Sequence, residues 1–83
     1  MHYKLTYSKS VVKTILKYDK PTRERIYNAL RNLPNGDVKR MQGQDSPPYF
    51  RLRVGDIRVL FIKDEMRMQI FVFDIDFRGN IYK

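Results

Sequence analysis

The chain has 83 residues, of which 42% are hydrophobic and 13% aromatic, a composition that excludes a disordered protein and fits a single domain spanning residues 1–83. It has no cysteine and one histidine, His2, which argues against a disulfide framework, a zinc site and a histidine-centred catalytic triad. Seventeen Lys and Arg against nine Asp and Glu give a net charge of +8 at pH 7, which favours a polyanionic partner, either nucleic acid or an acidic protein segment.

Membrane association is not expected. No apolar run approaches the length of a transmembrane span, and the N-terminus lacks the apolar core of a signal peptide. No helix combines a strongly basic face with a wide apolar one. We therefore expect a soluble, cytoplasmic protein that does not bind membranes.

The first half of the chain predicts a strand followed by two helices. Residues 2–7 alternate between apolar and polar side chains, as in a half-buried strand. Ser8 offers an N-cap to a helix that should end near Tyr18. Pro21 favours the first turn of a second helix, which should run to about Leu33. The apolar positions of both helices recur at helical spacing, so the two helices should form a hairpin with one apolar face.

Residues 34–48 are a long polar connection between the helices and the rest of the chain. Connections of this length in a compact domain are usually functional or mobile. Lys39 and Arg40 lie within it, and Met41 is expected to be the buried anchor that holds it to the domain.

Residues 49–61 predict a β-hairpin whose two-residue turn is Gly55 and Asp56. This turn pairs Val54 with Ile57, Arg53 with Arg58, Leu52 with Val59, Arg51 with Leu60, and Phe50 with Phe61. Directly opposed residues share a face of a sheet. One face is therefore apolar, and the other carries Tyr49, Arg51, Arg53 and Arg58, followed by Leu60 and Ile62.

The opposition of Arg53 and Arg58 is locally unfavourable, because like charges facing each other on a sheet cost several tenths of a kcal/mol. That cost is understandable if the arginines bind an anion, since guanidinium groups fit phosphate bidentately. The alternative is that Asp74, Asp76 or a backbone carbonyl neutralises the arginines.

A further strand should run from Arg67 to about Ile75, after a turn at residues 63–66. This turn would pair Phe61 with Met68, Val59 with Ile70, and Ile57 with Val72. The same register would place Phe71, Phe73 and Ile75 beside the arginines, and Asp74 and Asp76 on the core side, with a bend or bulge near Asp76. Either a partner protein or the C-terminal tail could cover such apolar side chains.

The element order and three segments resemble the RelE/ParE superfamily of toxins from bacterial and archaeal toxin–antitoxin modules. The segments are the hairpin at residues 51–61, the Lys-Arg-Met-Gln-Gly run at residues 39–43, and the spacing of Arg78 to Tyr82. The resemblance covers essentially the whole chain. It implies an α+β, RelE-like microbial RNase fold, in which an N-terminal strand and a helical hairpin are followed by antiparallel strands that form one twisted sheet packed on the helices.

The resemblance to RelE-type members also implies a function. These are metal-independent endoribonucleases that enter the ribosomal A site, cut mRNA there by attack of a 2′-hydroxyl on the adjacent phosphate, and so inhibit translation. Their partners would be ribosomal RNA, mRNA and a cognate antitoxin that neutralises the toxin in a hetero-oligomer, with no cofactor. The implied catalytic residues are Arg51, Arg53, Arg58, Arg78 and Tyr82, and the implied RNA-binding residues are Lys39, Arg40, Tyr49, Phe77 and Lys83.

Two departures from the family pattern leave the acid and the base unassigned. Phe77 stands where many relatives have His, and Asp76 stands where they have Gly, so a histidine-centred mechanism is excluded. Arginine side chains are poor proton donors and acceptors. Two alternatives therefore remain: a ParE-like toxin that inhibits gyrase without cleaving RNA, and a degenerate member that only binds RNA or an antitoxin.

Overall fold

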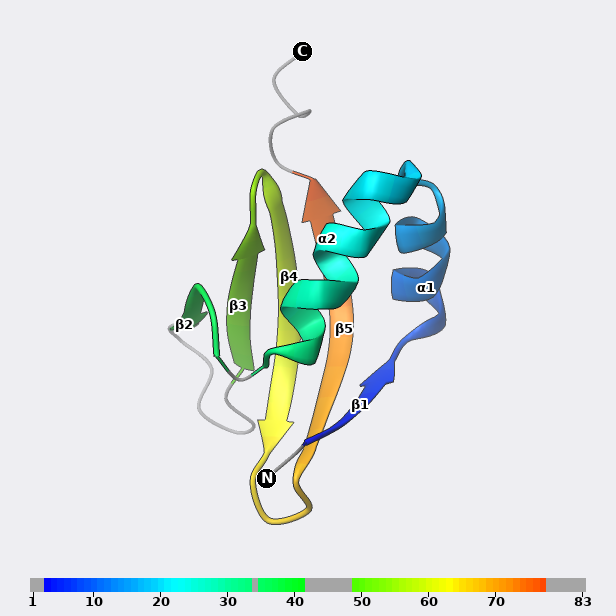
Figure 1. The fold of residues 1–83 in the computed structure, drawn as a ribbon. Helices are drawn as coiled ribbons and strands as arrows, with labels where there is room; N and C mark the ends of the chain where they lie inside the picture. Colours follow the sequence, from blue (N-terminus) through cyan, green and yellow to red (C-terminus); the bar gives the residue numbers. More distant parts are fainter. Residues whose placement is uncertain (1–2, 34, 42–48, 78–83) are drawn as a thin grey trace.

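The computed structural model describes residues 3–33, 35–41 and 49–77, which form one five-stranded sheet and two helices. The elements in chain order are β1 (Lys4–Tyr7), α1 (Lys9–Leu16), α2 (Lys20–Arg31), β2 (Val38–Arg40), β3 (Tyr49–Val54), β4 (Ile57–Asp64) and β5 (Gln69–Phe77). Both helices lie on the same side of the sheet (Figure 1). None of the described helices is long and apolar enough to cross a membrane.

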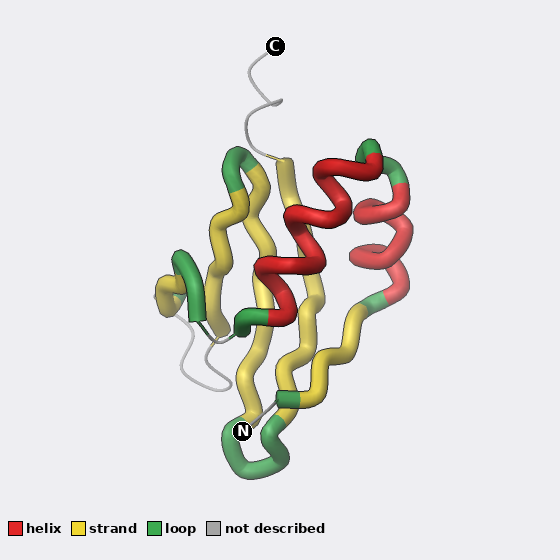
Figure 2. Tube along the Cα trace, viewed as in Figure 1, coloured by secondary structure: helices red, strands yellow, loops and turns green. Residues whose placement is uncertain are grey.

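The sheet has the spatial order β1-β5-β4-β3-β2. Strands β2 to β5 are joined by antiparallel pairings, whereas β1 lies parallel to β5. The helical hairpin covers one face in a separate layer (Figure 2). The α+β architecture expected from the sequence is confirmed, with a mixed rather than wholly antiparallel sheet.

The two helices begin where the sequence predicts, because each has a local start signal. The Ser8 hydroxyl accepts a hydrogen bond from the Val11 backbone N–H at 3.2 Å, and Pro21 occupies the first turn of α2. Both helices end about two residues earlier than expected. They present Val11, Ile15, Ile26 and Leu30 to the sheet as buried side chains.

The core lies between the helices and one face of the sheet. The sheet contributes Leu52, Ile57, Val59, Phe61, Ile70, Val72 and Ile75 to it. Phe61, on the central strand β4, is 0% exposed and stacks on Phe50 of β3, with ring centroids 5.5 Å apart. The opposite face, not covered by helices, is called the open face below.

The β3–β4 hairpin has the predicted register at every pair, including Arg53 opposite Arg58. Its turn begins at Gly55, whose φ of +60° lies in the left-handed region. Glycine at the first position of a two-residue turn is the requirement of a type II′ hairpin. The Arg25 side chain packs over the turn, with its Nη2 2.9 Å from the point where a Cβ on Gly55 would lie.

Strand β2 was not predicted, because residues 38–40 lie in a segment whose composition is that of a loop. Lys39 pairs with Arg51, and Arg40 pairs with Phe50. The Met41 backbone N–H donates to the Tyr49 carbonyl at 2.9 Å, and its side chain is half-buried. Such a short edge strand is specified by hydrogen bonds to β3 rather than by a local apolar pattern.

The predicted register between β4 and β5 was wrong. Strand β4 continues through Asp64, so the turn falls after Asp64 and not at residues 63–66. Phe61 consequently pairs with Val72 rather than Met68. The error arose because the charged residues Lys63 and Asp64 were assigned to the turn, although both lie in the strand.

A second correction concerns the faces of β5. Leu60 pairs with Asp74 whereas Phe61 pairs with Val72, so β5 has one extra residue, Phe73, at this point. The bulge therefore lies three residues before its expected position near Asp76. Beyond it the alternation is reversed from the prediction: Ile75 is buried in the core, and Asp74 and Asp76 lie on the open face.

The central position of Phe61 predicts a large effect of truncation. Phe61→Ala is expected to destabilise the domain by about 3–5 kcal/mol, because a fully buried ring is replaced by a cavity. Phe71→Ala is the matched control, since Phe71 is 39% exposed on the open face, and it should cost about 1 kcal/mol or less. Urea denaturation measures both values, and equal losses would contradict the assignment of the two faces.

The turn geometry predicts that Gly55→Ala is destabilising by about 1–2 kcal/mol, because an L-residue is strained at positive φ. Its methyl group would also displace the Arg25 side chain. Asp56→Ala is the control, since Asp56 is not among the described residues with positive φ. Thermal unfolding of the two variants should show a lower Tm for Gly55→Ala only.

Candidate nucleic-acid interface

The open face carries an arginine cluster formed by Arg51 and Arg53 of β3 and Arg58 of β4. Arg53 lies directly opposite Arg58, and Arg51 is two residues further along the same side of β3. Arg51 and Arg58 are half-buried, whereas Arg53 is exposed. The sheet therefore presents three guanidinium groups from two adjacent strands on one surface.

Two nitrogen atoms of the arginine cluster are buried. The Nε atoms of Arg51 and Arg58 are buried, and neither has a hydrogen-bond partner among the described residues. A buried donor without a partner costs roughly 1–3 kcal/mol. The aliphatic stems of these arginines are thus held against the sheet, which limits the directions in which their charged ends can point.

One carboxylate partly neutralises the cluster. Arg58 lies opposite Asp76 of β5, and its Nη2 donates to the Asp76 Oδ2 at 3.2 Å. The Arg58 side chain is 26% exposed and that of Asp76 is 42% exposed, so this ion pair contributes about 1 kcal/mol or less to stability. The sequence suggested Asp76 as a possible counter-charge but placed it on the wrong face, because the bulge was expected near Asp76 and lies at Phe73 instead.

The two basic residues of β2 lie in different places. Lys39 pairs with Arg51 and therefore adds a fourth positive charge to the open face. Arg40 pairs with Phe50, on the opposite face. It lines a pocket of about 470 Å³ together with Lys63 and residues of the β4–β5 turn. Of the two predicted RNA-binding residues on β2, only Lys39 lies on the same face as the arginine cluster.

An apolar strip lies beside the arginine cluster, formed by Tyr49, Ile62, Phe71 and Phe73. The Tyr49 and Phe73 rings meet edge to face, with centroids 5.4 Å apart. Phe71 pairs with Ile62 and remains 39% exposed. The expected combination of aromatic and basic side chains is therefore present, with Ile75 absent from it.

Of the predicted C-terminal site residues, the described part of the chain includes the backbone of Phe77. The Phe77 backbone pairs with Ile57, next to the β3–β4 turn, and its side chain lies outside the described part of the chain. Arg78, Tyr82 and Lys83 also lie outside the described residues. Strand β5 thus ends at the same end of the sheet as Arg53 and Arg58.

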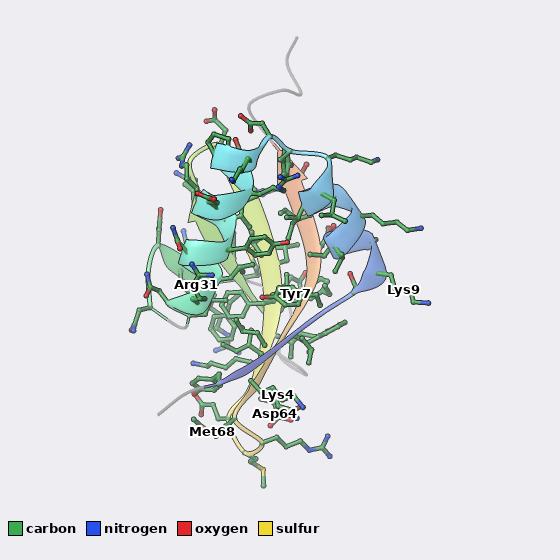
Figure 3. The ribbon with its side chains drawn as sticks, turned by 45° about the vertical axis from the view of Figure 1, so that its right-hand side comes forward. Lys4, Tyr7, Lys9, Arg31, Asp64 and Met68 are labelled. Carbon is green, nitrogen blue, oxygen red and sulfur yellow. The ribbon has the colours of Figure 1, made fainter. Side chains whose placement is uncertain are left out.

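Neither of the half-buried tyrosines Tyr7 and Tyr18 is activated for proton transfer. Burial raises the pKa of Tyr18 above its usual value, and the negative charge of Asp76 raises it further. Burial also raises the pKa of Tyr7, and Tyr27 adds to the rise, whereas the positive charge of Arg31 on α2 opposes it (Figure 3). No group of three or more potential metal ligands occurs among the described residues.

No family model and no curated protein sequence matches the chain. Solved structures do match it. A chain of the archaeal RelE–RelB complex from Pyrococcus horikoshii OT3 superposes with a TM-score of 0.78 at 25% identity, covering 96% of this chain and 99% of that one. A chain of the toxin–antitoxin complex RelBE2 from Mycobacterium tuberculosis gives 0.79 at 15% identity, with coverages of 96% and 95%.

The isolated RelE toxin from E. coli also matches, with a TM-score of 0.63 at 19% identity over 96% of this chain and 90% of that chain. Each of these matches covers 96% of this chain. The resemblance read from the sequence is thereby confirmed, and over nearly its whole length the chain is RelE-like.

Proposed function

We propose that this chain is the toxin of a type II toxin–antitoxin module and acts as a ribosome-dependent endoribonuclease that cleaves mRNA in the A site. The observation that carries the proposal is the arginine cluster, in which Arg53 directly opposes Arg58 and Arg51 lies beside them. A folded domain tolerates three neighbouring guanidiniums most easily where an anion neutralises them. A phosphodiester has the charge and the shape that fit such a set.

The arginine cluster would act on the transition state. Attack of the 2′-hydroxyl on the adjacent phosphorus gathers negative charge on the phosphoryl oxygens, and fixed guanidinium groups stabilise that charge as it develops. Arg58 is the central member, because it lies between β3 and β5 and its stem is held against the sheet. Arg78 and Tyr82, which follow β5 in the sequence, are proposed to complete the site.

The apolar strip and Lys39 would hold the message. Aromatic side chains beside a basic surface stack on nucleobases, and each such contact is worth about 1–3 kcal/mol. Tyr49 and Phe71 supply exposed or half-exposed rings, and Lys39 supplies a charge for a flanking phosphate. Phe77 and Lys83 are proposed to extend this surface toward the C-terminus. The site would then read the message chiefly through its backbone and through stacking.

We also infer that an antitoxin neutralises this protein by covering the open face. RelE relatives from Pyrococcus horikoshii and Mycobacterium tuberculosis have been solved in complexes with RelB or as RelBE2. The open face offers an apolar strip that a partner could bury and three arginines that an acidic segment could pair. A partner bound there would exclude RNA from the same residues.

Substitution of Arg58 tests the proposed activity. We expect Arg58→Ala to lower the rate of mRNA cleavage by roughly 10²–10³-fold, the usual effect of removing one group that stabilises transition-state charge. Arg58→Lys should restore only part of the activity, because it keeps the charge without the planar fork. Primer extension on a defined mRNA in a reconstituted translation system, with and without ribosomes, measures the cuts.

Arg67→Ala is the matched control, because Arg67 is 77% exposed in the β4–β5 turn, at the other end of the sheet from the β3–β4 turn. It should cleave as the wild type does. An intact message during continued translation with wild-type protein would rule out the endoribonuclease and leave gyrase inhibition or simple binding. Cleavage by Arg58→Ala at the wild-type rate would contradict the proposal that the arginine cluster stabilises the transition state.

A further inference from the structure

The proposed reaction requires a group that accepts the proton of the 2′-hydroxyl, and the arginine cluster does not supply one. Guanidinium groups stay protonated at any pH at which proteins function. The titratable groups that the described residues place on this part of the open face are Lys39, Tyr49, Arg51, Arg53, Arg58, Asp74 and Asp76. Of these side-chain types, only the carboxylates are ordinarily proton acceptors at neutral pH.

The two carboxylates differ in their surroundings. Asp74 pairs with Leu60, and its Oδ1 accepts a hydrogen bond from the Ile75 backbone N–H at 2.9 Å. Asp76 pairs with Arg58, and its Oδ2 accepts from the Arg58 Nη2 at 3.2 Å. Only Asp76 is therefore joined to a member of the arginine cluster. It also lies two residues before Arg78 in the sequence.

The ion pair leaves Asp76 free to act on substrate. It occupies Oδ2, and the side chain is 42% exposed, so a ribose can approach the carboxylate from solvent. A guanidinium that binds a carboxylate through one nitrogen and a phosphate through another holds the two anions at neighbouring edges of one plane. The 2′-hydroxyl is adjacent to the scissile phosphate, so this arrangement brings the hydroxyl and the carboxylate together.

We propose that Asp76 is the general base of the RNA cleavage reaction, an assignment that rests on the proposed endoribonuclease function. Its carboxylate takes the 2′-hydroxyl proton as O2′ forms a bond to phosphorus. The P–O5′ bond breaks, and the leaving 5′ oxygen takes a proton from solvent water. The products are a 2′,3′-cyclic phosphate and a 5′-hydroxyl end, and the Asp76 proton returns to solvent.

The charged and titratable neighbours of Asp76 fit this role. Arg58 on β4 keeps a positive charge beside the carboxylate, and Arg53 on β3 lies opposite Arg58. Asp74 precedes it by two residues on the same strand and face. Tyr18, which follows α1, is close enough for its own ionisation to feel the Asp76 charge. Asp76 is thus at the border of the positive cluster, where it can reach a bound phosphodiester.

Asp76→Asn separates proton transfer from the positioning of Arg58. The amide oxygen can still accept a hydrogen bond from the Arg58 Nη2, but the amide cannot take up a proton at neutral pH. We measure single-turnover cleavage of mRNA on programmed ribosomes for the wild type and for Asp76→Asn, Asp76→Ala, Asp76→Glu and Asp74→Asn. Binding of each protein to the same ribosomes and its thermal unfolding are followed in parallel.

We expect Asp76→Asn and Asp76→Ala to lose cleavage to a similar degree, roughly 10²–10⁴-fold, the usual contribution of a general base. Asp76→Glu should retain more activity than either, and Asp74→Asn should cleave as the wild type does. All variants should bind ribosomes like the wild type and stay folded, with Asp76→Ala melting at most slightly lower because it loses the partly exposed ion pair with Arg58.

Near-normal cleavage by Asp76→Asn would overturn the assignment. Loss in Asp76→Ala alone would also overturn it, because Asp76 would then only position Arg58. If the wild type cleaves no message, the proposed endoribonuclease function is wrong, and so is the assignment of Asp76 as its general base. If the wild type and Asp76→Asn cleave equally well, the function stands and only the assignment of Asp76 is wrong.

Discussion

The register of the β3–β4 hairpin is the constraint on which the open face depends. Leu52 and Val59 face the helices as a buried pair, and this fixes Arg53 opposite Arg58 on the other side. A slip of one residue would move the arginines into the core and the apolar side chains into solvent. Packing in the core therefore keeps the arginines close together despite their mutual repulsion. This repulsion lowers the stability of the hairpin locally and is the consequence of forming a positively charged open face.

The bulge at Phe73 decides which side chains of β5 meet that surface. An uninterrupted strand would turn Asp74 and Asp76 toward the helices, where unpaired carboxylates are strongly unfavourable. The extra residue instead sends Ile75 into the core and brings Asp76 to Arg58. It also lets the Phe73 ring meet Tyr49. The single extra residue at the bulge thus brings the arginine cluster, its counter-charge Asp76 and the apolar strip together on the open face.

Much of this arrangement could be predicted from the sequence, because its strongest signals are local. The Gly55 turn specified the hairpin and all its pairs, and Ser8 and Pro21 marked the helix starts. What could not be predicted depends on partners distant in the chain. Strand β2 is defined by its pairing with β3. The bulge at Phe73 depends on how β5 pairs with β4 while it also packs against the helices. The carboxylates were therefore seen in the sequence but assigned to the wrong face.

The position of β5 between β1 and β4 has a consequence for the synthesis of the protein. The first strand has no neighbour in the sheet until the last strand is present, since β1 pairs with residues 69–72. A nascent chain still lacking these residues cannot close its sheet, however complete its helices are. Long-range pairing of this kind also slows folding. A chain with the proposed action on ribosomes would thus complete its sheet only after residues 69–72 have been synthesised, which separates the synthesis of its first strand from its action.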